Sequence, residues 1–321
     1  MSKQRQADTE AALAGVLAQE FGLRGTIQRL ESEVDETFRI DTTDGAPLLV
    51  KVAHVDETEE TVSFQTGLLC HLQLAAPDLP VPWPRPTTDG APYLTPRAGP
   101  LAGRIIRVTS FLPGQALGTV RSTRRLREQV GRTLAILGHA LRGYDHPAAH
   151  RPVVWDIQNL AGLRPMADAV DPPDRRRTLL GQIDRFEDST APALAKLRAQ
   201  VVHNDFNSDN VLVGPDRLSV SGIVDFGDAT YTPLVNDVAV MAAYQLSDGP
   251  DGGTGCRAGV AGEAVTRQPA IPAADHRPGL DSAEPPSCRP RRTDPPAHRA
   301  GVSPRSPECL IRRAWPAPRT W

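Results

Sequence analysis

Apolar residues recur with helical spacing in several parts of the chain. The clearest case is a stripe of five residues that share one helix face: Leu126, Val130, Leu134, Leu137 and Leu141. Because this stripe is continuous, it predicts a core helix rather than a site. Similar spacing predicts helices or helical turns over residues 7–21, 57–74, 126–144, 179–186, 191–197 and 233–246.

Short apolar runs bounded by turn residues predict strands. Such runs occupy residues 26–30, 38–41, 47–53 and 102–111, and Asp44-Gly45 marks a hairpin turn between two of them. Two later runs, 211–213 and 220–224, enclose Gly214-Pro215-Asp216. Two short strands around a tight turn predict a hairpin.

Polar residues stand at both ends of the predicted hairpin. His203-Asn204-Asp205 precedes it, and Asn210 follows Asp205 by five residues. The second strand leads into Asp225-Phe226-Gly227-Asp228. The hairpin geometry brings Asp205, Asn210 and Asp225 towards one point.

This trio is typical of phosphoryl transfer. Magnesium prefers hard oxygen ligands, and a carboxylate with an amide oxygen can hold it against nucleotide phosphates. The spacing H-x-D-x-x-x-x-N followed by D-F-G matches the kinase set, which predicts Asp205 as base and Asn210 and Asp225 as metal ligands. His203 is expected to brace the loop rather than react. The alternative is a polar loop in an unrelated α/β domain.

The stretch resembles the aminoglycoside phosphotransferase and choline kinase branch of the protein-kinase-like fold. Within that branch, HNDFNSDNVLV…GIVDFGDATYTPLVNDVAV is most similar to the hydroxylysine-kinase-like group, and Asn207 stands where protein kinases usually carry lysine. The resemblance covers roughly residues 8–247. It implies a two-lobed, protein-kinase-like α+β fold, with a nucleotide-binding lobe over residues 1–109 and a catalytic lobe over 110–249.

The resemblance also implies a nucleotide site. Lys51 lies in a predicted strand of a chain with three lysines, and it takes the place of the lysine that binds phosphates. The loop from Ser32 to Thr37 is expected over the nucleotide, although it lacks GxGxxG. Gln65 takes the place of the acid that orients the lysine, with Glu59 and Glu60 as alternatives. Backbone groups from Ser110 to Leu112 are expected to meet the purine.

One tryptophan and three aspartates are candidates for the acceptor pocket or for support of the catalytic loop. Trp155 and Asp156 match an R…WD element of the related group and are candidates for the acceptor pocket; the alternative is a packing tryptophan and a capping aspartate. The resemblance implies that Asp237 braces the catalytic loop through a backbone contact. Asp228 is expected to support the loop rather than bind metal.

Composition and charge limit the cellular compartment and the classes of partner that we expect. The net charge of −2 gives no basic footprint for nucleic acid or a membrane surface, and no apolar run approaches the ~20 residues that span a bilayer. The polar N-terminus is no secretory signal, and four cysteines without a CxxC pair suggest neither a disulfide framework nor a zinc site. The cytoplasm is the expected compartment. Nothing in the sequence indicates an oligomeric state.

The amino-acid composition of the chain changes after Gly249. Residues 250–321 are rich in Pro, Arg, Gly and Ala and hold no helical stripe, so they are expected to be disordered. The related group continues with helices that complete the second lobe. A reading-frame shift, a truncated gene or a native low-complexity tail would each give this pattern.

These observations predict a kinase that uses Mg²⁺ and ATP or GTP. The expected acceptor is the hydroxyl group of a small amine-bearing metabolite, with hydroxylysine first. An aminoglycoside, homoserine or choline kinase is the alternative of the same class. A catalytically impaired remnant that only binds nucleotide is the alternative of another class.

Overall fold

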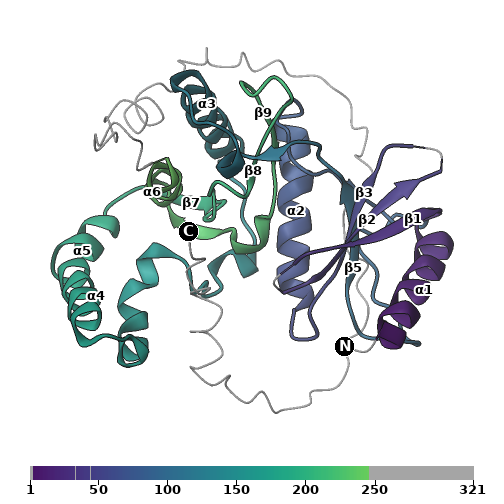
Figure 1. Ribbon diagram of the computed structural model, residues 1–321, viewed down its shortest axis with the longest axis horizontal. Helices are drawn as coiled ribbons and strands as arrows, with labels where there is room; N and C mark the ends of the chain where they lie inside the picture. The colour runs from purple at the N-terminus through teal and green to yellow at the C-terminus, as the bar shows by residue number, and fades with distance from the viewer. Residues whose placement is uncertain (1–2, 33, 44, 246–321) are drawn as a thin grey trace, which may run out of the picture. The chain divides into compact units, whose positions relative to one another are not determined.

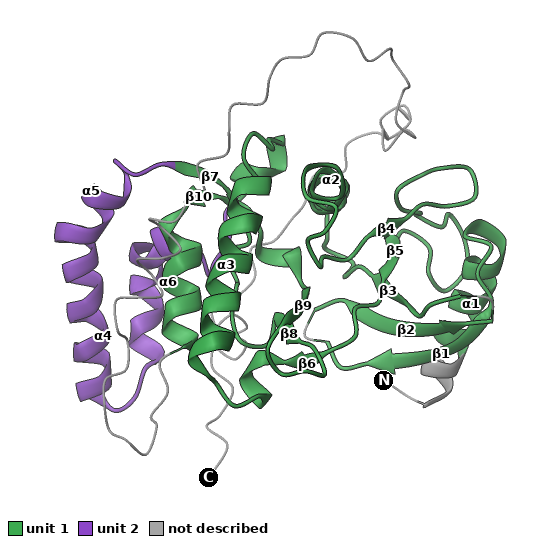
Figure 2. Ribbon diagram, turned by 90° about the horizontal axis from the view of Figure 1, so that it is seen from above, with its two compact units in different colours: residues 1–151, 199–291 green, residues 152–198, 292–321 purple. Residues whose placement is uncertain are grey.

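The computed structural model describes residues 3–32, 34–43 and 45–245 (Figure 1). The chain divides into two compact units (Figure 2): unit 1 takes Met1–Arg151 and Ala199–Arg291, and unit 2 takes Pro152–Arg198 and Arg292–Trp321. The predicted lobe boundary at 109/110 falls inside unit 1 and stays a prediction. The predicted tail, residues 250–321, lies outside the described residues.

The N-terminal part of unit 1 is an antiparallel sheet with helix α1 (Lys3–Glu20) against it. The sheet runs in the order β1-β2-β3-β5-β4. Its strands are β1 (Gly25–Leu30), β2 (Glu36–Thr42), β3 (Leu48–Val52), β4 (Pro84–Arg85) and β5 (Ile106–Ser110). Val50 and Val52 face α1, so the alternation along β3 turns Lys51 to the opposite face.

Two helices predicted from apolar spacing are confirmed. Helix α2 (Glu59–Ala75) begins after Thr58, whose side chain accepts the N–H of Thr61. Helix α3 (Arg124–Ala140) begins after Thr123, whose side chain accepts the N–H of Leu126. Each threonine satisfies one of the orphan N–H groups of a first turn, which fixes where the helix starts.

The predicted hairpin is also confirmed: β8 (Val211–Val213) pairs antiparallel with β9 (Val220–Ile223). A short strand, β6 (Gln115–Ala116), joins the edge of β8. Strand β7 (Ala199–Val202), which leads into the polar loop, pairs with β10 (Thr230–Pro233). Helix α6 (Val235–Tyr244) follows. The polar loop is thus held between two short ladders.

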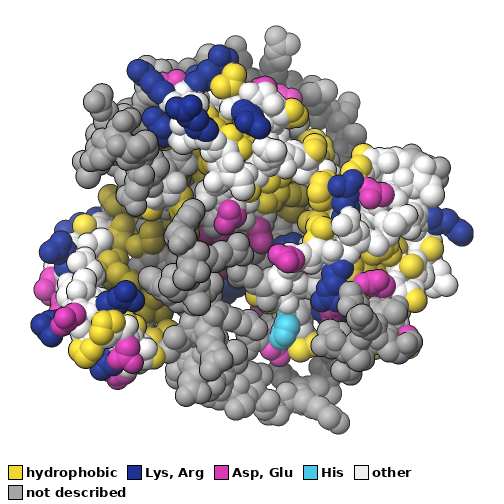
Figure 3. All heavy atoms as spheres, in the orientation of Figure 1, with side chains coloured by type: hydrophobic (Ala, Val, Ile, Leu, Met, Phe, Trp, Pro, Cys, Tyr) yellow, Lys and Arg dark blue, Asp and Glu magenta, His cyan; other side chains and the backbone are white. Residues whose placement is uncertain are grey.

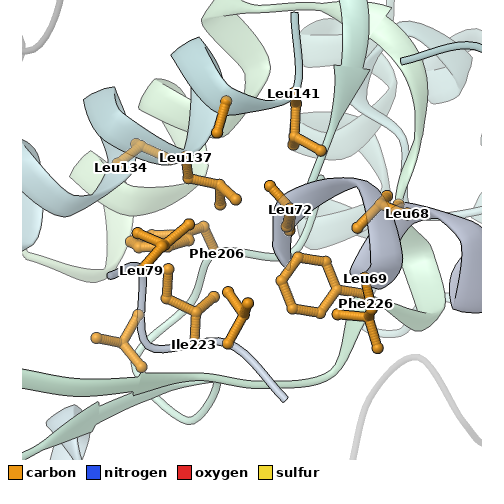
Figure 4. Close-up of a cluster of buried hydrophobic side chains, with 14 of the residues drawn as sticks. Leu68, Leu69, Leu72, Leu79, Leu134, Leu137, Leu141, Phe206, Ile223 and Phe226 are labelled. Atoms are coloured by element: carbon orange, nitrogen blue, oxygen red, sulfur yellow. The ribbon is translucent and has the colours of Figure 1, made fainter. Parts of the chain in front are cut away.

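One apolar cluster of unit 1 brings together residues of α2, α3, β7, β8, β9 and α6. Figure 4 shows Phe206 of the polar loop and Phe226 of the tripeptide among leucines of α2 and α3. Phe206 and Phe226 are 1% and 5% exposed, and burial of such a side chain contributes about 1.5–3 kcal/mol. The polar residues on either side of each phenylalanine are therefore anchored by the core.

The described part of unit 2, residues 152–198, is helical. It contains η3 (Ile157–Ala169), α4 (Pro173–Arg185), the π-turn η4 (Phe186–Thr190) and α5 (Ala191–Leu194). Helix α4 starts six residues earlier than its apolar spacing indicated, because Pro173 suits the first helical turn. Arg164 of η3 donates to Asp184 and Glu187, at 2.7 and 2.5 Å.

Charged side chains of both signs are interspersed on the face drawn in Figure 3, and a group of basic side chains lies over α3, which carries Arg124, Arg125 and Arg127. Among the described helices, none is long and apolar enough to cross a membrane.

Candidate active site

The loop from His203 to Asn210 holds the Asp205 carboxylate between two amide donors. Asn207 Nδ2 donates to Oδ1 at 2.8 Å, and Asn210 Nδ2 donates to Oδ2 at 2.7 Å. Asn207 Oδ1 also accepts the N–H groups of Asp209 and Asn210, which closes the turn. A carboxylate oxygen accepts two hydrogen bonds, so each Asp205 oxygen retains capacity for an incoming O–H.

Asp205 is more basic than an ordinary aspartate. Burial raises the pKa of Asp205 to about 6, and the neighbouring carboxylates of Asp228 and Asp225 act in the same direction. The amide hydrogen bonds from Asn207 and Asn210 oppose this rise in pKa. A carboxyl group with a pKa near 6 is ionised at neutral pH and accepts a proton more readily than an unperturbed one.

His203 is a neutral brace. Burial lowers the pKa of His203 to about 4, so the imidazole carries no charge at neutral pH. Its Nε2–H donates to the carbonyl of Val224 at 3.0 Å, which leaves Nδ1 to accept the N–H of Asp205 at 3.3 Å. The ring also lies 4.6 Å from the Phe226 ring, centroid to centroid. His203 thus ties Asp205 to the strand end that carries Asp225.

Asp237 of α6 fixes the start of the same loop. Its Oδ2 accepts the N–H of His203 at 3.0 Å, and its Oδ1 accepts the N–H of Asn204 at 2.6 Å. Asn204 has φ +64°, a left-handed conformation that a non-glycine residue adopts at a cost. The backbone contact expected for Asp237 is present, and it stabilises a strained turn beside Asp205.

Asp237→Ala is expected to destabilise the fold. It leaves two buried backbone N–H groups unpaired, at about 1–3 kcal/mol each. Denaturant unfolding measures the loss. Asp237→Asn is the matched control, because its amide keeps one acceptor oxygen and should lose less. Equal stability of wild type and Asp237→Ala would show that the two contacts do not hold the loop.

Asp225 ends the hairpin in a left-handed conformation, with φ +61°. Its Oδ1 accepts the N–H of Gly227 and the Lys51 ammonium, both at 3.2 Å. Desolvation acts to raise the pKa of Asp225. The opposite effect is larger and holds the pKa below its usual value: it comes from the charge and hydrogen bond of Lys51, the N–H of Gly227 and the charge of Arg107. Asp225 is therefore an anion beside a cation, and its side chain is 53% exposed.

The donor set around Asp225 fits magnesium bound to nucleotide. Asn210 uses Nδ2 for Asp205, which leaves its amide oxygen as a hard donor on the same loop. Within the described residues, no three His, Cys, Asp or Glu side chains group as a metal cage. Magnesium typically takes one or two protein carboxylates and completes its shell with phosphate oxygens and water. Asp225 and Asn210 match that use.

A cavity of about 280 Å³ opens beside Lys51 and Asp225. Its walls are mostly apolar, and its lining includes Leu49, Leu69, Val108, Leu212 and Val224. Lys51, Gln65 and Arg107 supply polar groups on the same lining. A mostly apolar cavity whose lining also includes cations and a carboxylate suits a flat purine ring linked to phosphates.

Ser110 and Leu112 line the cavity, and their role toward a purine stays a prediction. The N–H of Ser110 donates to the carbonyl of Trp83, and the N–H of Phe111 donates to that of Pro47. No hydrogen bond within the described residues uses the N–H of Leu112. Of these three N–H groups, that of Leu112 is the donor available to a purine.

Ser32 occupies a different position from the other predicted nucleotide ligands. Its hydroxyl accepts a hydrogen bond from Thr37 Oγ1 at 3.1 Å, which links the two ends of the loop between β1 and β2. It does not lie among the residues that line the cavity. Its role toward phosphates stays a prediction.

Comparison with known proteins decides the family. Residues 26–269, about three quarters of the chain, match the model of the phosphotransferase enzyme family. The chain belongs to this phosphotransferase family. Similar proteins include hydroxylysine kinase of Mus musculus, 26% identical over 74% of this chain and 69% of the relative, and homoserine kinase of Acidiphilium cryptum, 30% identical over 72% and 69%.

Solved structures support the same fold for this phosphotransferase. An amicoumacin kinase in complex with AMP-PNP, Ca²⁺ and Ami superposes with a TM-score of 0.55 at 17% identity, covering 77% of this chain and 72% of the other. APH(2″)-IIIa with GDP and kanamycin also gives a TM-score of 0.55, at 15% identity, covering 73% and 78%. The α+β, kinase-like fold predicted from the sequence is confirmed.

Gln65 of the phosphotransferase has a different partner from the expected one. Its Oε1 accepts a short hydrogen bond from Arg107 Nη1, and its Nε2 donates to the carbonyl of Gly227 at 3.3 Å. The bond to Lys51 that the sequence suggested does not occur among the described residues, because Lys51 reaches Asp225 instead. Gln65 still lies in the cavity wall.

Arg151, the arginine of the R…WD element, makes contacts that its position in the sequence did not predict. Arg151 of unit 1 donates to the carbonyls of Gly227 and Ala229, at 2.6 and 2.7 Å, and lies over the Phe64 ring. In unit 2, Asp156 accepts the N–H of Gln158 and begins η3, which is the capping alternative. Trp155 is half exposed. Because the chain has many arginines and Gly227 and Ala229 lie 76 and 78 residues from Arg151, nothing near Arg151 in the sequence predicts these contacts.

Proposed function

We propose that the chain is a small-molecule kinase that transfers the γ-phosphoryl group of ATP or GTP to a hydroxyl group of an amine-bearing metabolite. Hydroxylysine is the first candidate acceptor. The observation that carries the proposal is one constellation in unit 1: Asp205 and Asn210 joined by a 2.7 Å hydrogen bond, and Asp225 joined to Lys51 at 3.2 Å beside an apolar cavity.

Each residue has a part in the transfer. When bound, the magnesium–nucleotide complex supplies the electrophilic phosphoryl group and neutralises its charge. Asp225 and the amide oxygen of Asn210 would hold the metal, and the Lys51 ammonium would bind phosphate oxygens. Asp205 would accept the proton of the acceptor hydroxyl, and its amide donors keep the carboxylate pointed at that proton.

The charge around Asp205 supports a cationic acceptor. Asp228 and Asp225 both act to raise the pKa of Asp205, so three carboxylates gather in one place. Such a field attracts an ammonium group and helps bring an amino alcohol to the base. The similarity to several hydroxylysine kinases favours hydroxylysine among such compounds. The similarity to a homoserine kinase makes homoserine the second candidate.

An acceptor panel tests this proposal. Hydroxylysine, homoserine, choline and kanamycin are each supplied with magnesium and ATP or GTP, and nucleoside diphosphate release is followed by a coupled assay. We expect kcat/KM to be highest for hydroxylysine, with lysine, which lacks the hydroxyl, inactive. A higher kcat/KM for homoserine would transfer the proposal to that acceptor. Nucleotide binding without turnover of any alcohol would instead favour the impaired remnant.

The absence of a basic footprint and of paired cysteines in the sequence supports a site of action in the cytoplasm, on small molecules rather than on nucleic acid or membranes.

A further inference from the structure

Two cations stand next to each other on the cavity face of the sheet. Lys51 of β3 lies directly opposite Arg107 of β5 in the antiparallel register, and both line the cavity. Like charges placed in this way destabilise a sheet unless each has a partner. Lys51 has Asp225, at 3.2 Å, and Arg107 has Asp35, at 3.5 Å.

Arg107 fixes the orientation of the Gln65 amide. A guanidinium group only donates hydrogen bonds, so the Gln65 atom that faces Arg107 is the carbonyl oxygen Oε1. The NH₂ group is then turned to the Gly227 carbonyl, to which it donates at 3.3 Å. A glutamate at this position could not make the second contact, because both of its oxygens are acceptors when it is ionised.

Gly227 connects Gln65 to Asp225, the proposed metal ligand. The N–H of Gly227 donates to Asp225 Oδ1, while its carbonyl accepts from Gln65 and from Arg151. On the other side, Asp35 joins Arg107 to the N–H of His54. One series of contacts therefore runs from the β1–β2 loop through Arg107 and α2 to the carboxylate that would hold the metal.

We propose that Arg107 is a positioning residue of the phosphate site, which acts through Gln65 to hold the Gly227 peptide and, with it, the Asp225 carboxylate. This inference rests on the proposed kinase function. In kinases at large, an acid on the corresponding helix pairs with the phosphate-binding lysine. In this chain the helix residue is bound to Arg107, and Lys51 is left to Asp225 and the phosphates.

The test uses Arg107→Met, Gln65→Leu and their double variant, with binding of MgATP and MgGTP measured by calorimetry and kcat and KM measured on the acceptor. We expect each single variant to lower kcat by about 10- to 100-fold through misplacement of the carboxylate. We also expect each to require more Mg²⁺ for half-saturation. The double variant should be no worse than the more damaging single one, because both substitutions break the same series of contacts.

Two further variants separate positioning from general stability. Gln65→Glu, which restores the acid usual in kinases, should also lose activity because it cannot donate to Gly227. Arg107→Lys should recover part of the activity, since an ammonium can still donate to Gln65. Arg29→Met is the control: it removes an arginine–carboxylate pair of the same sheet, Arg29–Glu36 at 3.0 Å, away from the cavity lining. It should leave kcat and the Mg²⁺ requirement unchanged.

The inference and the proposed function fail in different ways. Wild-type protein that binds no magnesium nucleotide would contradict the proposed function and the inference together. Wild-type protein that binds nucleotide, with Arg107→Met equal to it in kcat and Mg²⁺ requirement, would overturn the inference alone. Multiplicative losses in the double variant, or an active Gln65→Glu, would also overturn it. Should Arg107→Met fail to fold, Gln65→Leu, Gln65→Glu and Arg107→Lys decide the matter.

Discussion

Asp205→Asn is expected to lower kcat by about 10²- to 10⁴-fold while magnesium–nucleotide binding persists. The substitution keeps the size of the side chain but removes the carboxylate that burial and neighbouring acids make unusually basic. It also places an amide against the Asn207 and Asn210 donors, so one of these contacts is lost. Steady-state kinetics on the preferred acceptor, with calorimetry for the nucleotide, measures both quantities.

Asp209→Asn is the matched control for this prediction. Asp209 lies in the same loop but is exposed, and its N–H rather than its carboxylate bonds to Asn207. Its replacement should leave kcat within about twofold of wild type, as is usual for surface substitutions. Near-normal kcat for Asp205→Asn would show that another group accepts the proton.

Asp225→Ala should abolish the Mg²⁺-dependent part of nucleotide affinity. The Asp225 carboxylate forms an ion pair with the Lys51 ammonium. Its lowered pKa keeps it anionic, which is the form that binds a metal ion. Its removal leaves Asn210 as the single predicted metal ligand and deprives Lys51 of its counter-charge. Calorimetric titration with MgATP or MgGTP, compared with titration in EDTA, isolates the magnesium-dependent term.

A second substitution separates the lost charge from backbone strain. Alanine at φ +61° is strained, whereas asparagine tolerates the left-handed region. Asp225→Asn should therefore fold as well as wild type and still lose magnesium-dependent affinity. If Asp225→Asn binds MgATP as wild type does, Asp225 is not the metal ligand.

The sequence predicted the parts of the site that are local. Asp205, Asn210 and Asp225 lie at fixed spacing around a hairpin, and a short hairpin permits few geometries, so their proximity could be inferred without coordinates. Lys51 was conspicuous because lysine is scarce in this chain. The helices α2 and α3 followed from apolar periodicity, whereas their threonine caps are findings of the structure.

The sequence could not predict the contacts between distant elements. Arg107 and Gln65 are 42 residues apart, and Arg151 and Gly227 are 76 residues apart; neither pair has a spacing that signals contact. In an arginine-rich chain, a single arginine is also inconspicuous. Strands β4 and β6 have two residues each, too few for an alternating pattern, and they form because partner strands supply their hydrogen bonds.

Transfer of a γ-phosphoryl label tests the central claim most directly. The protein is incubated with Mg²⁺, γ-labelled ATP or GTP and hydroxylysine, and the product is separated and its phosphate located by phosphorus NMR. The account predicts that the label reaches the hydroxyl oxygen of the acceptor in wild type and Asp209→Asn, but not measurably in Asp205→Asn or Asp225→Ala. Label that reaches no alcohol, or that transfers equally well in Asp205→Asn, would contradict it.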